Sequence, residues 1–177
     1  MNEAQSLQRA IDEPVHLAEY DPAWPAHFDA ERERLLERFP AALIEVQHIG
    51  STAIPGMPAK PIIDVMAGVA SMAMADALFE PILDHGYVTS VEFNVSLTDR
   101  RWFMRHAHGR RTHHLHVVVY DGELWHQRLA FRDALRADPT QATRYAALKR
   151  ELASRHQADR EAYTLAKGEF VNSVIAQ

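Results

Sequence analysis

The sequence contains no cysteine, so neither disulfide bonds nor thiolate metal sites belong to this protein. It also has no apolar run near the roughly 20 residues that a membrane-spanning helix needs. The N-terminal segment is polar and acidic, without the basic start and apolar centre of a signal peptide. We therefore expect a cytoplasmic protein that does not bind a membrane.

An excess of positive charge is absent as well. The 19 lysine and arginine residues are outnumbered by 24 acids, and the formal net charge is −5. This balance gives no strong signal for nucleic-acid binding. The length of 177 residues and the hydrophobic content of 47% are typical of one globular domain with a buried core.

Hydrophobic periodicity predicts an α+β fold, in which helices flank a mixed sheet of about four to six strands. We expect one domain over residues 1–177, with a sheet core over about 15–121 and a helical C-terminal part over about 124–177. The predicted main strands cover residues 42–49, 61–69, 87–95, 102–106 and 113–120. The predicted helices cover about 22–36, 72–85, 125–136, 141–156 and 159–175. Pro81 predicts a kink or break in the second of these helices.

The stretch HIGSTAIPGMPAKPIIDVMAGV, from His48 to Val69, organises the predicted sheet. A Gly-Ser-Thr turn ends one apolar strand, and a proline-rich turn leads to the next. Glycine beside a small hydroxyl at a strand end lets phosphate oxygens approach free backbone N–H groups. Asp64 interrupts the second apolar strand, and a carboxylate there needs a cation, a metal or an open cleft. The pattern therefore predicts a site for a metal and a phosphate group.

These residues carry a resemblance to known proteins. Gly50-Ser51, twelve further residues and then Asp64 is similar to the signature of the polymerase-β-like nucleotidyltransferase superfamily. More specifically, HIGSTAIPG with KPIID resembles the GrpB family of bacterial proteins, as do YDPAWP, HHLHVVV, RYAALKREL and YTLAKGEFV elsewhere in the chain. The resemblance covers nearly the whole chain and implies a nucleotidyltransferase fold. The chain departs from the superfamily at Met66, where a second acid is usual and would bridge two metal ions.

Two histidines of the HHLHVVV motif are candidate metal ligands. His114 and His116 are two residues apart on a predicted strand, so both imidazoles point to one face. In the superfamily a third acid stands in this region, and the resemblance implies that His116 takes its place. We expect Asp64, His114 and His116 to bind a divalent metal ion, with imidazole shifting the preference from magnesium toward zinc or nickel. The alternatives are an Asp64 that caps the turn or pairs with an arginine, and histidines that only pack on the sheet.

The remaining candidates surround the turn. We expect Asp64 and His48 to be the catalytic residues, although His48 at the strand end could instead only hydrogen-bond the turn. The residues predicted to bind a nucleoside triphosphate are Gly50, Ser51, Thr52 and Lys60. Arg132, Arg136 and Lys149 are further candidates if the C-terminal helices fold over the cleft.

The sequence leaves several functions open. The first hypothesis is metal-dependent nucleotidyl transfer to an unidentified acceptor, with the ion neutralising charge at the reacting phosphorus. The second is a non-catalytic module on the same fold that binds a nucleotide or a phosphorylated small molecule. The family implies a coenzyme-A-related ligand for such a module, because GrpB-like domains are fused to dephospho-CoA kinase in some proteins. A histidine-metal hydrolase is a third hypothesis. The sequence does not specify the oligomeric state.

Overall fold

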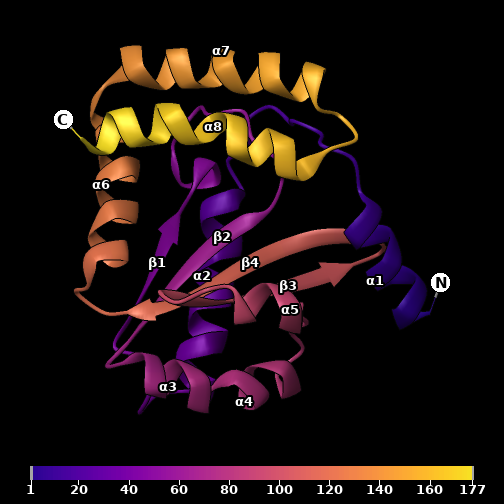
Figure 1. Ribbon diagram of the computed structural model, residues 1–177, viewed down its shortest axis with the longest axis vertical. Coiled ribbons are helices and arrows are strands. Elements are labelled where there is room, and N and C mark those ends of the chain that lie inside the picture. Colours follow the sequence, from indigo (N-terminus) through magenta and orange to yellow (C-terminus); the bar gives the residue numbers. More distant parts are fainter. Residues whose placement is uncertain (1, 177) are drawn as a thin grey trace.

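The protein is organised around one mixed sheet of four strands, and a computed structural model describes residues 2–176. The strands lie in the order β1-β2-β4-β3 (Figure 1). β1 (Glu45–Ile49) is antiparallel to β2 (Ile63–Val69), β2 is parallel to β4 (Arg110–Val119), and β4 is antiparallel to β3 (Arg100–Ala107). The sheet and its surrounding helices confirm the predicted α+β fold.

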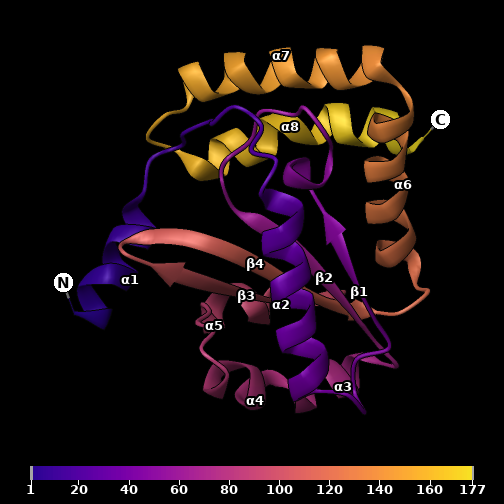
Figure 2. The same cartoon turned by 180° about the vertical axis from the view of Figure 1, so that it is seen from behind.

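Helices lie on both sides of this sheet. α2 crosses the face seen in Figure 2, with α3 and α4 near one end, whereas α6, α7 and α8 form a separate group at the other end. The helices are α1 (Glu3–Asp12), α2 (Trp24–Arg38), α3 (Met72–Ala77), α4 (Phe79–Asp84), α5 (Val91–Val95), α6 (Glu123–Ala137), α7 (Pro139–Arg155), α8 (Arg160–Ile175) and the 3₁₀ turn η1 (Ser51–Ala53). No helix within residues 2–176 is long and apolar enough to cross a lipid bilayer.

The main core lies between the sheet and α2, α3 and α4. Successive side chains of a strand point to opposite faces, so the odd-numbered residues of β2 form one apolar row. Trp24 and Phe28 of α2 pack in the same cluster, together with Leu115 of β4. Burying an apolar side chain of this size contributes roughly 1.5–3 kcal/mol, so this core fixes β2 and β4 firmly in place.

The opposite face of the sheet is only partly covered. Met66 of β2 packs with Ile49, Val118 and Trp125, and Trp125 anchors α6 to the sheet. α7 and α8 pack on α6 and on the turn after β1 through a separate apolar cluster. The rest of this face, around Asp64, therefore lines a cleft.

The predicted helix over residues 72–85 breaks at Leu78 into α3 and α4, as Pro81 indicated. The predicted strand over 87–95 is wrong, because Val91–Val95 forms helix α5 and only Val88 makes a β-bridge, to Met104.

Polar contacts explain why this segment is helical. The Ser90 hydroxyl accepts a hydrogen bond from the Phe93 backbone N–H, which caps the helix. The Asn94 side chain accepts from the Trp102 N–H at 2.8 Å and donates to the Trp102 carbonyl at 2.9 Å. The apolar residues whose alternation indicated a strand are exposed to solvent, with 80% of Val95 accessible.

Candidate functional site

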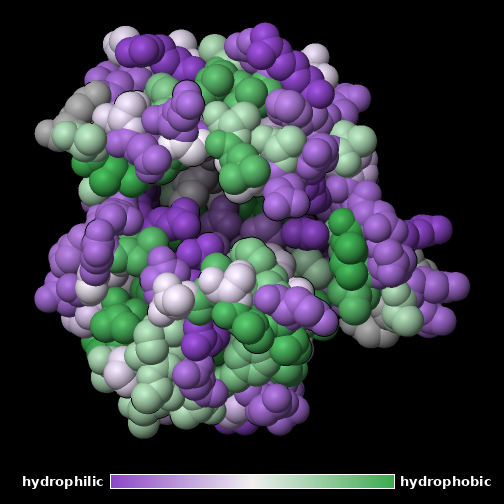
Figure 3. All heavy atoms as spheres, viewed as in Figure 1, coloured by the Kyte–Doolittle hydropathy of each residue, from purple (hydrophilic) through white to green (hydrophobic). Residues whose placement is uncertain are grey.

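A cleft of about 640 Å³ lies between the open face of the sheet and helices α6, α7 and α8. Figure 3 shows it as a hollow across the middle of this face, with hydrophilic side chains inside. The predicted site residues that line it are Gly50, Ser51, Thr52, Lys60, Asp64, His114 and His116. The structure thus brings together residues that are more than 60 positions apart in the chain.

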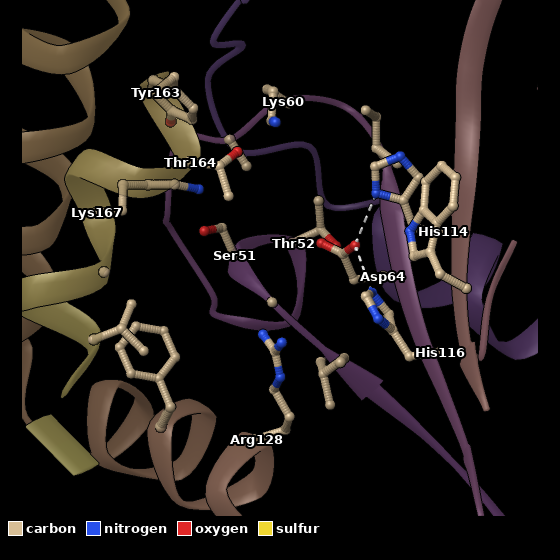
Figure 4. Close-up of a pocket in the computed structure, with 18 of the residues that line it drawn as sticks. Ser51, Thr52, Lys60, Asp64, His114, His116, Arg128, Tyr163, Thr164 and Lys167 are labelled. Carbon is tan, nitrogen blue, oxygen red and sulfur yellow. Dashed lines mark ion pairs between the residues drawn. The ribbon is translucent and has the colours of Figure 1, made fainter. Parts of the chain in front are cut away.

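The parallel pairing of β2 and β4 places Asp64 beside the two histidines. Asp64 pairs with His114 and Met66 pairs with His116, so all four side chains lie on the cleft face. The Asp64 Oδ1 atom is 3.3 Å from His114 Nδ1 and 3.8 Å from His116 Nε2 (Figure 4).

These contacts set the protonation of the cluster. Burial alone would raise the pKa of Asp64, but the adjacent imidazoles of His114 and His116 hold it below its usual range. Burial lowers the pKa of His116 to about 4 and also lowers that of His114. At neutral pH the carboxylate is therefore charged and both imidazoles are neutral, which is the form that binds metal ions.

Gly50 allows the turn to approach Asp64. Its backbone has φ +72°, and a Cβ atom at this position would be 2.5 Å from Asp64 Oδ2. Any other residue would therefore both strain the backbone and displace the carboxylate. The next residue, Ser51, begins η1 and lines the cleft together with Tyr145 of α7.

His48 does not reach the cleft. It pairs with Val65, so its side chain points to the opposite face, where the ring stacks on Phe28 at 4.7 Å. Its Nε2 atom is 2.9 Å from the Thr52 hydroxyl, and burial lowers its pKa to about 4. The position of His48 fits the alternative of a histidine that hydrogen-bonds the turn, and its catalytic role stays a prediction.

Lysine is confined to this cleft. The chain has only three lysines among its 19 basic residues, and Lys60, Lys149 and Lys167 all line the cleft. Burial and neighbouring cations lower the pKa of Lys60 and of Lys149 to about 7, and burial lowers that of Lys167 to about 8. Three cations that repel each other in one cleft indicate a site prepared for an anion.

Two of these lysines belong to the same local motif. Tyr145 and Lys149 on α7, and Tyr163 and Lys167 on α8, are each four residues apart, which places both side chains on one helix face. The lysine Nζ lies 5.0 Å from the Tyr145 ring centre in the first pair and 4.6 Å from the Tyr163 ring centre in the second. Lys60 lies 5.1 Å from the same Tyr163 ring.

The electrostatics of the cleft are opposite to those of the whole chain. Asp64 is the one carboxylate among the described residues that line it. The cationic lining residues are Lys60, Arg100, Arg111, Arg128, Lys149 and Lys167. An anionic ligand is therefore expected in the cleft, although the formal net charge of the chain is −5.

Comparison with known proteins places the chain in a family. The sequence profile described as "GrpB protein" matches residues 14–177. The chain belongs to the GrpB family. It is 34% identical to the conserved protein GrpB from Enterococcus faecalis, whose crystal structure superimposes with a TM-score of 0.80 over 91% of this chain and 95% of that one.

Other relatives of this GrpB family member are longer. The UPF0157 protein YqkA of Bacillus subtilis is 36% identical over 90% of this chain, which spans 46% of YqkA. A dephospho-CoA kinase of Mycolicibacterium paratuberculosis is 35% identical over 92% of this chain and 45% of the kinase. The chain thus spans about half the length of these two proteins.

A more distant likeness concerns the fold alone. The Cid1 poly(U) polymerase superimposes with a TM-score of 0.52 at 14% identity, over 85% of this chain and 49% of Cid1. This likeness confirms that the GrpB chain has a nucleotidyltransferase-like fold.

The donors around Asp64 fit a metal ion only in part. Asp64, His114 and His116 offer one oxygen and two nitrogens, but no group of three or more histidine, aspartate or glutamate side chains within residues 2–176 is placed to hold an ion by itself. The ring atoms His114 Nε2 and His116 Nδ1 are buried without a hydrogen-bond partner. Metal binding at these three residues remains a prediction, and a ligand would have to supply further donors.

Several cleft residues were not predicted from the sequence. Arg128, Lys167 and Trp102 line the cleft. The repeated Tyr-x-x-x-Lys spacing and the scarcity of lysine are signals in the sequence that could have found Lys167. Arg132 and Arg136, by contrast, bind the turn instead of the cleft. Arg132 donates to the His48 carbonyl at 3.0 Å, and Arg136 donates to the Ala53 carbonyl at 2.9 Å.

Proposed function

We propose that this GrpB family member binds the triphosphate of a nucleoside triphosphate in the cleft and transfers the nucleotidyl group to an acceptor. The observation that carries the proposal is the confinement of all three lysines to a cleft that also contains the Gly50-Ser51 turn and Asp64. Arg100, Arg111 and Arg128 line the same cleft, and the lysines add compact charges to it. Lysine ammonium groups act as such point charges on phosphates.

The residues of the cleft have two roles in this proposal, which are binding of the phosphates and neutralisation of charge at the reacting phosphorus. Lys60, Lys149 and Lys167 neutralise the terminal phosphates, which leave as pyrophosphate, while backbone N–H groups at Ser51 donate to the same oxygens. The pKa of each lysine is lowered in the free protein. A bound polyanion would raise these pKa values again, so the lysine amines take up protons when it binds. A divalent ion, when bound through Asp64 and the neighbouring imidazoles, would neutralise the charge that develops at the reacting phosphorus.

One observation favours a second candidate, in which the same cleft binds without turnover. Met66 stands where the superfamily resemblance places a second acid, and it is fully buried beside Trp125. A site with a single carboxylate on β2 supplies fewer ligands for a pair of metal ions. The ligand would then be a nucleotide or a coenzyme-A-related phosphate, as the relative named dephospho-CoA kinase suggests.

The test combines binding with turnover. The purified chain is incubated with each nucleoside triphosphate and with Mg²⁺, Mn²⁺ or Zn²⁺, and pyrophosphate release and calorimetric binding are measured. We expect Asp64→Asn to abolish release while nucleotide binding persists without metal. The double variant Lys60→Met, Lys167→Met should weaken binding by about 100-fold or more, since each charged contact contributes roughly 1.5–3 kcal/mol. Binding without release under all conditions would favour the non-catalytic module.

Lysine labelling locates the ligand independently. The chain has no lysine outside the cleft. Side-chain labelling by a lysine-reactive reagent, measured by mass spectrometry, therefore reports on the accessibility of the cleft, and labelling of the N-terminal amine serves as the internal control. We expect ATP to protect the lysines and leave labelling of the N-terminal amine unchanged. ATP that protects no lysine would refute the binding of a nucleoside triphosphate at the lysines.

A further inference from the structure

A second cationic group lies across Asp64 from Lys60, although its Arg128 is near enough to Lys167 for the two charges to repel. In Figure 4, Lys60 and Arg128 lie on opposite sides of Asp64. Arg128 projects from α6, and Arg100 projects from β3 on the cleft face, because it pairs with Val118 of β4. Burial and the nearby Arg100 guanidinium lower the pKa of Arg128, so two positive groups are held together here.

Neither arginine is neutralised within the cleft. Arg128 has no hydrogen bond or ion pair with the described part of the chain. Arg100 pairs with the exposed Asp99 at 3.0 Å through one terminal nitrogen, but its Nε is buried without a partner. A buried donor without an acceptor costs about 1–3 kcal/mol, and an anionic ligand would satisfy it.

An aromatic surface lies beside Arg100, because Trp102 is two residues further along β3 on the same face. Phe93 of α5 and Trp102 of β3 both line the cleft and meet edge-on, with ring centres 5.5 Å apart. Trp102 also lies 5.3 Å from the His114 ring, so the aromatic surface continues to the Asp64 cluster. Phe93 is 43% exposed, and Asn94 holds α5 against the Trp102 backbone. A fixed, half-exposed aromatic pair beside cations is suited to a planar ring that carries an anion.

We propose that Phe93, Trp102, Arg100 and Arg128 form the acceptor subsite, and that the acceptor is a nucleotide-like molecule with an aromatic ring joined to a phosphate. This inference rests on the proposed function, which assigns the lysine side of the cleft to the triphosphate. The ring stacks on Trp102, and the phosphate satisfies Arg128 and the Nε of Arg100. The acceptor is then held next to Asp64, on the side away from Lys60.

Tryptophan fluorescence tests this subsite directly. Trp24 and Trp125 are buried, with 3% and 4% exposure, so Trp102 is the one tryptophan that a cleft ligand can contact. The chain is first saturated with tripolyphosphate to fill the lysine side, and AMP, adenosine and ribose 5-phosphate are then titrated. We expect AMP to quench the fluorescence, and adenosine and ribose 5-phosphate to bind about tenfold or more weakly, since each lacks one recognised group.

Matched variants separate the contributions of the ring and the phosphate. Trp102→Leu should abolish quenching and Arg128→Gln should weaken AMP about tenfold, both without changing the affinity for tripolyphosphate. Arg144→Gln, an exposed arginine of α7 outside the cleft, is the control and should change neither. The assignment would be overturned if AMP bound no tighter than adenosine or no tighter than ribose 5-phosphate. It would also be overturned if every variant, including Arg144→Gln, lost AMP binding.

Two further outcomes have distinct meanings. If AMP does not bind while tripolyphosphate does, the acceptor subsite is wrong and the proposed function stands. If tripolyphosphate does not bind to the wild type, the proposed function fails, and AMP quenching by itself then reports only on the aromatic subsite. A single-stranded oligonucleotide that binds more than about tenfold tighter than AMP would overturn the assignment to a small molecule.

Discussion

The contact between Gly50 and Asp64 provides the sharpest test of how the site is built. Replacing Gly50 by alanine places a Cβ atom 2.5 Å from Asp64 Oδ2, whereas real Cβ contacts are essentially never below 3.0 Å. The carboxylate must therefore retreat by at least 0.5 Å, the difference of these two distances. Asp64 Oδ1 is 3.3 Å from His114 Nδ1, so a shift of this size disturbs the contact between the carboxylate and the imidazole.

The backbone adds a cost that a control can separate. Gly50 has φ +72° and ψ −171°, a conformation that is almost restricted to glycine and costs roughly 1–3 kcal/mol for other residues. Gly56 has φ +77° but no atom within 4 Å of its would-be Cβ, so Gly56→Ala carries backbone strain without a collision. We expect both variants to lose about 1–3 kcal/mol of unfolding free energy, and Gly50→Ala to lose ligand binding as well.

The assay pairs urea denaturation with calorimetric titration of ATP and Mn²⁺. Gly56→Ala is expected to bind as the wild type does, and Gly50→Ala is expected to bind at least tenfold more weakly, because its displaced carboxylate no longer faces the ion and the phosphates. If Gly50→Ala binds normally, or if Gly56→Ala loses the same affinity, then the close approach of Gly50 to Asp64 does not organise the site.

Two further predictions concern charge in the cleft. The affinity for ATP, measured without metal, should fall as the pH rises from about 7 to 9: the pKa of Lys60 and of Lys149 is about 7 and that of Lys167 about 8, so the free protein loses the cations that hold the phosphates. Binding should be accompanied by proton uptake, measured by calorimetry in buffers of different ionisation enthalpy. An affinity that does not fall with rising pH would contradict the role of the lysines. Met66→Asp should destabilise the protein by roughly 3–5 kcal/mol in urea denaturation, because the side chain is fully buried beside Asp64 and the new carboxylate would have no partner. Met66→Leu conserves volume and should cost less than about 1.5 kcal/mol, and a Met66→Asp variant as stable as the wild type would show that the site accepts a second acid.

The sequence by itself determined the local parts of this site. The apolar runs around Asp64 specified β2, and the period of two in β4 placed His114 and His116 on one face without any knowledge of the fold. The Gly-Ser turn and the scarcity of lysine are also written in the sequence, as is the Tyr-x-x-x-Lys spacing on α7 and α8. Each of these features depends on residues that are close together in the chain, so periodicity and composition are enough to show them.

Only the tertiary structure decided which of these parts meet. Pairing of β2 with β4 sets Asp64 against His114, and the same alternation turns His48 to the other face, because neighbouring residues of a strand point in opposite directions. Packing of α7 and α8 on the turn after β1 brings Lys149 and Lys167 to the cleft from more than 80 residues away. α5 became a helix because Ser90 and Trp102 satisfy its polar groups, although its apolar residues alternate as in a strand. A local pattern fixes the period of an element, but its partner and its exposed side depend on the packing of distant residues.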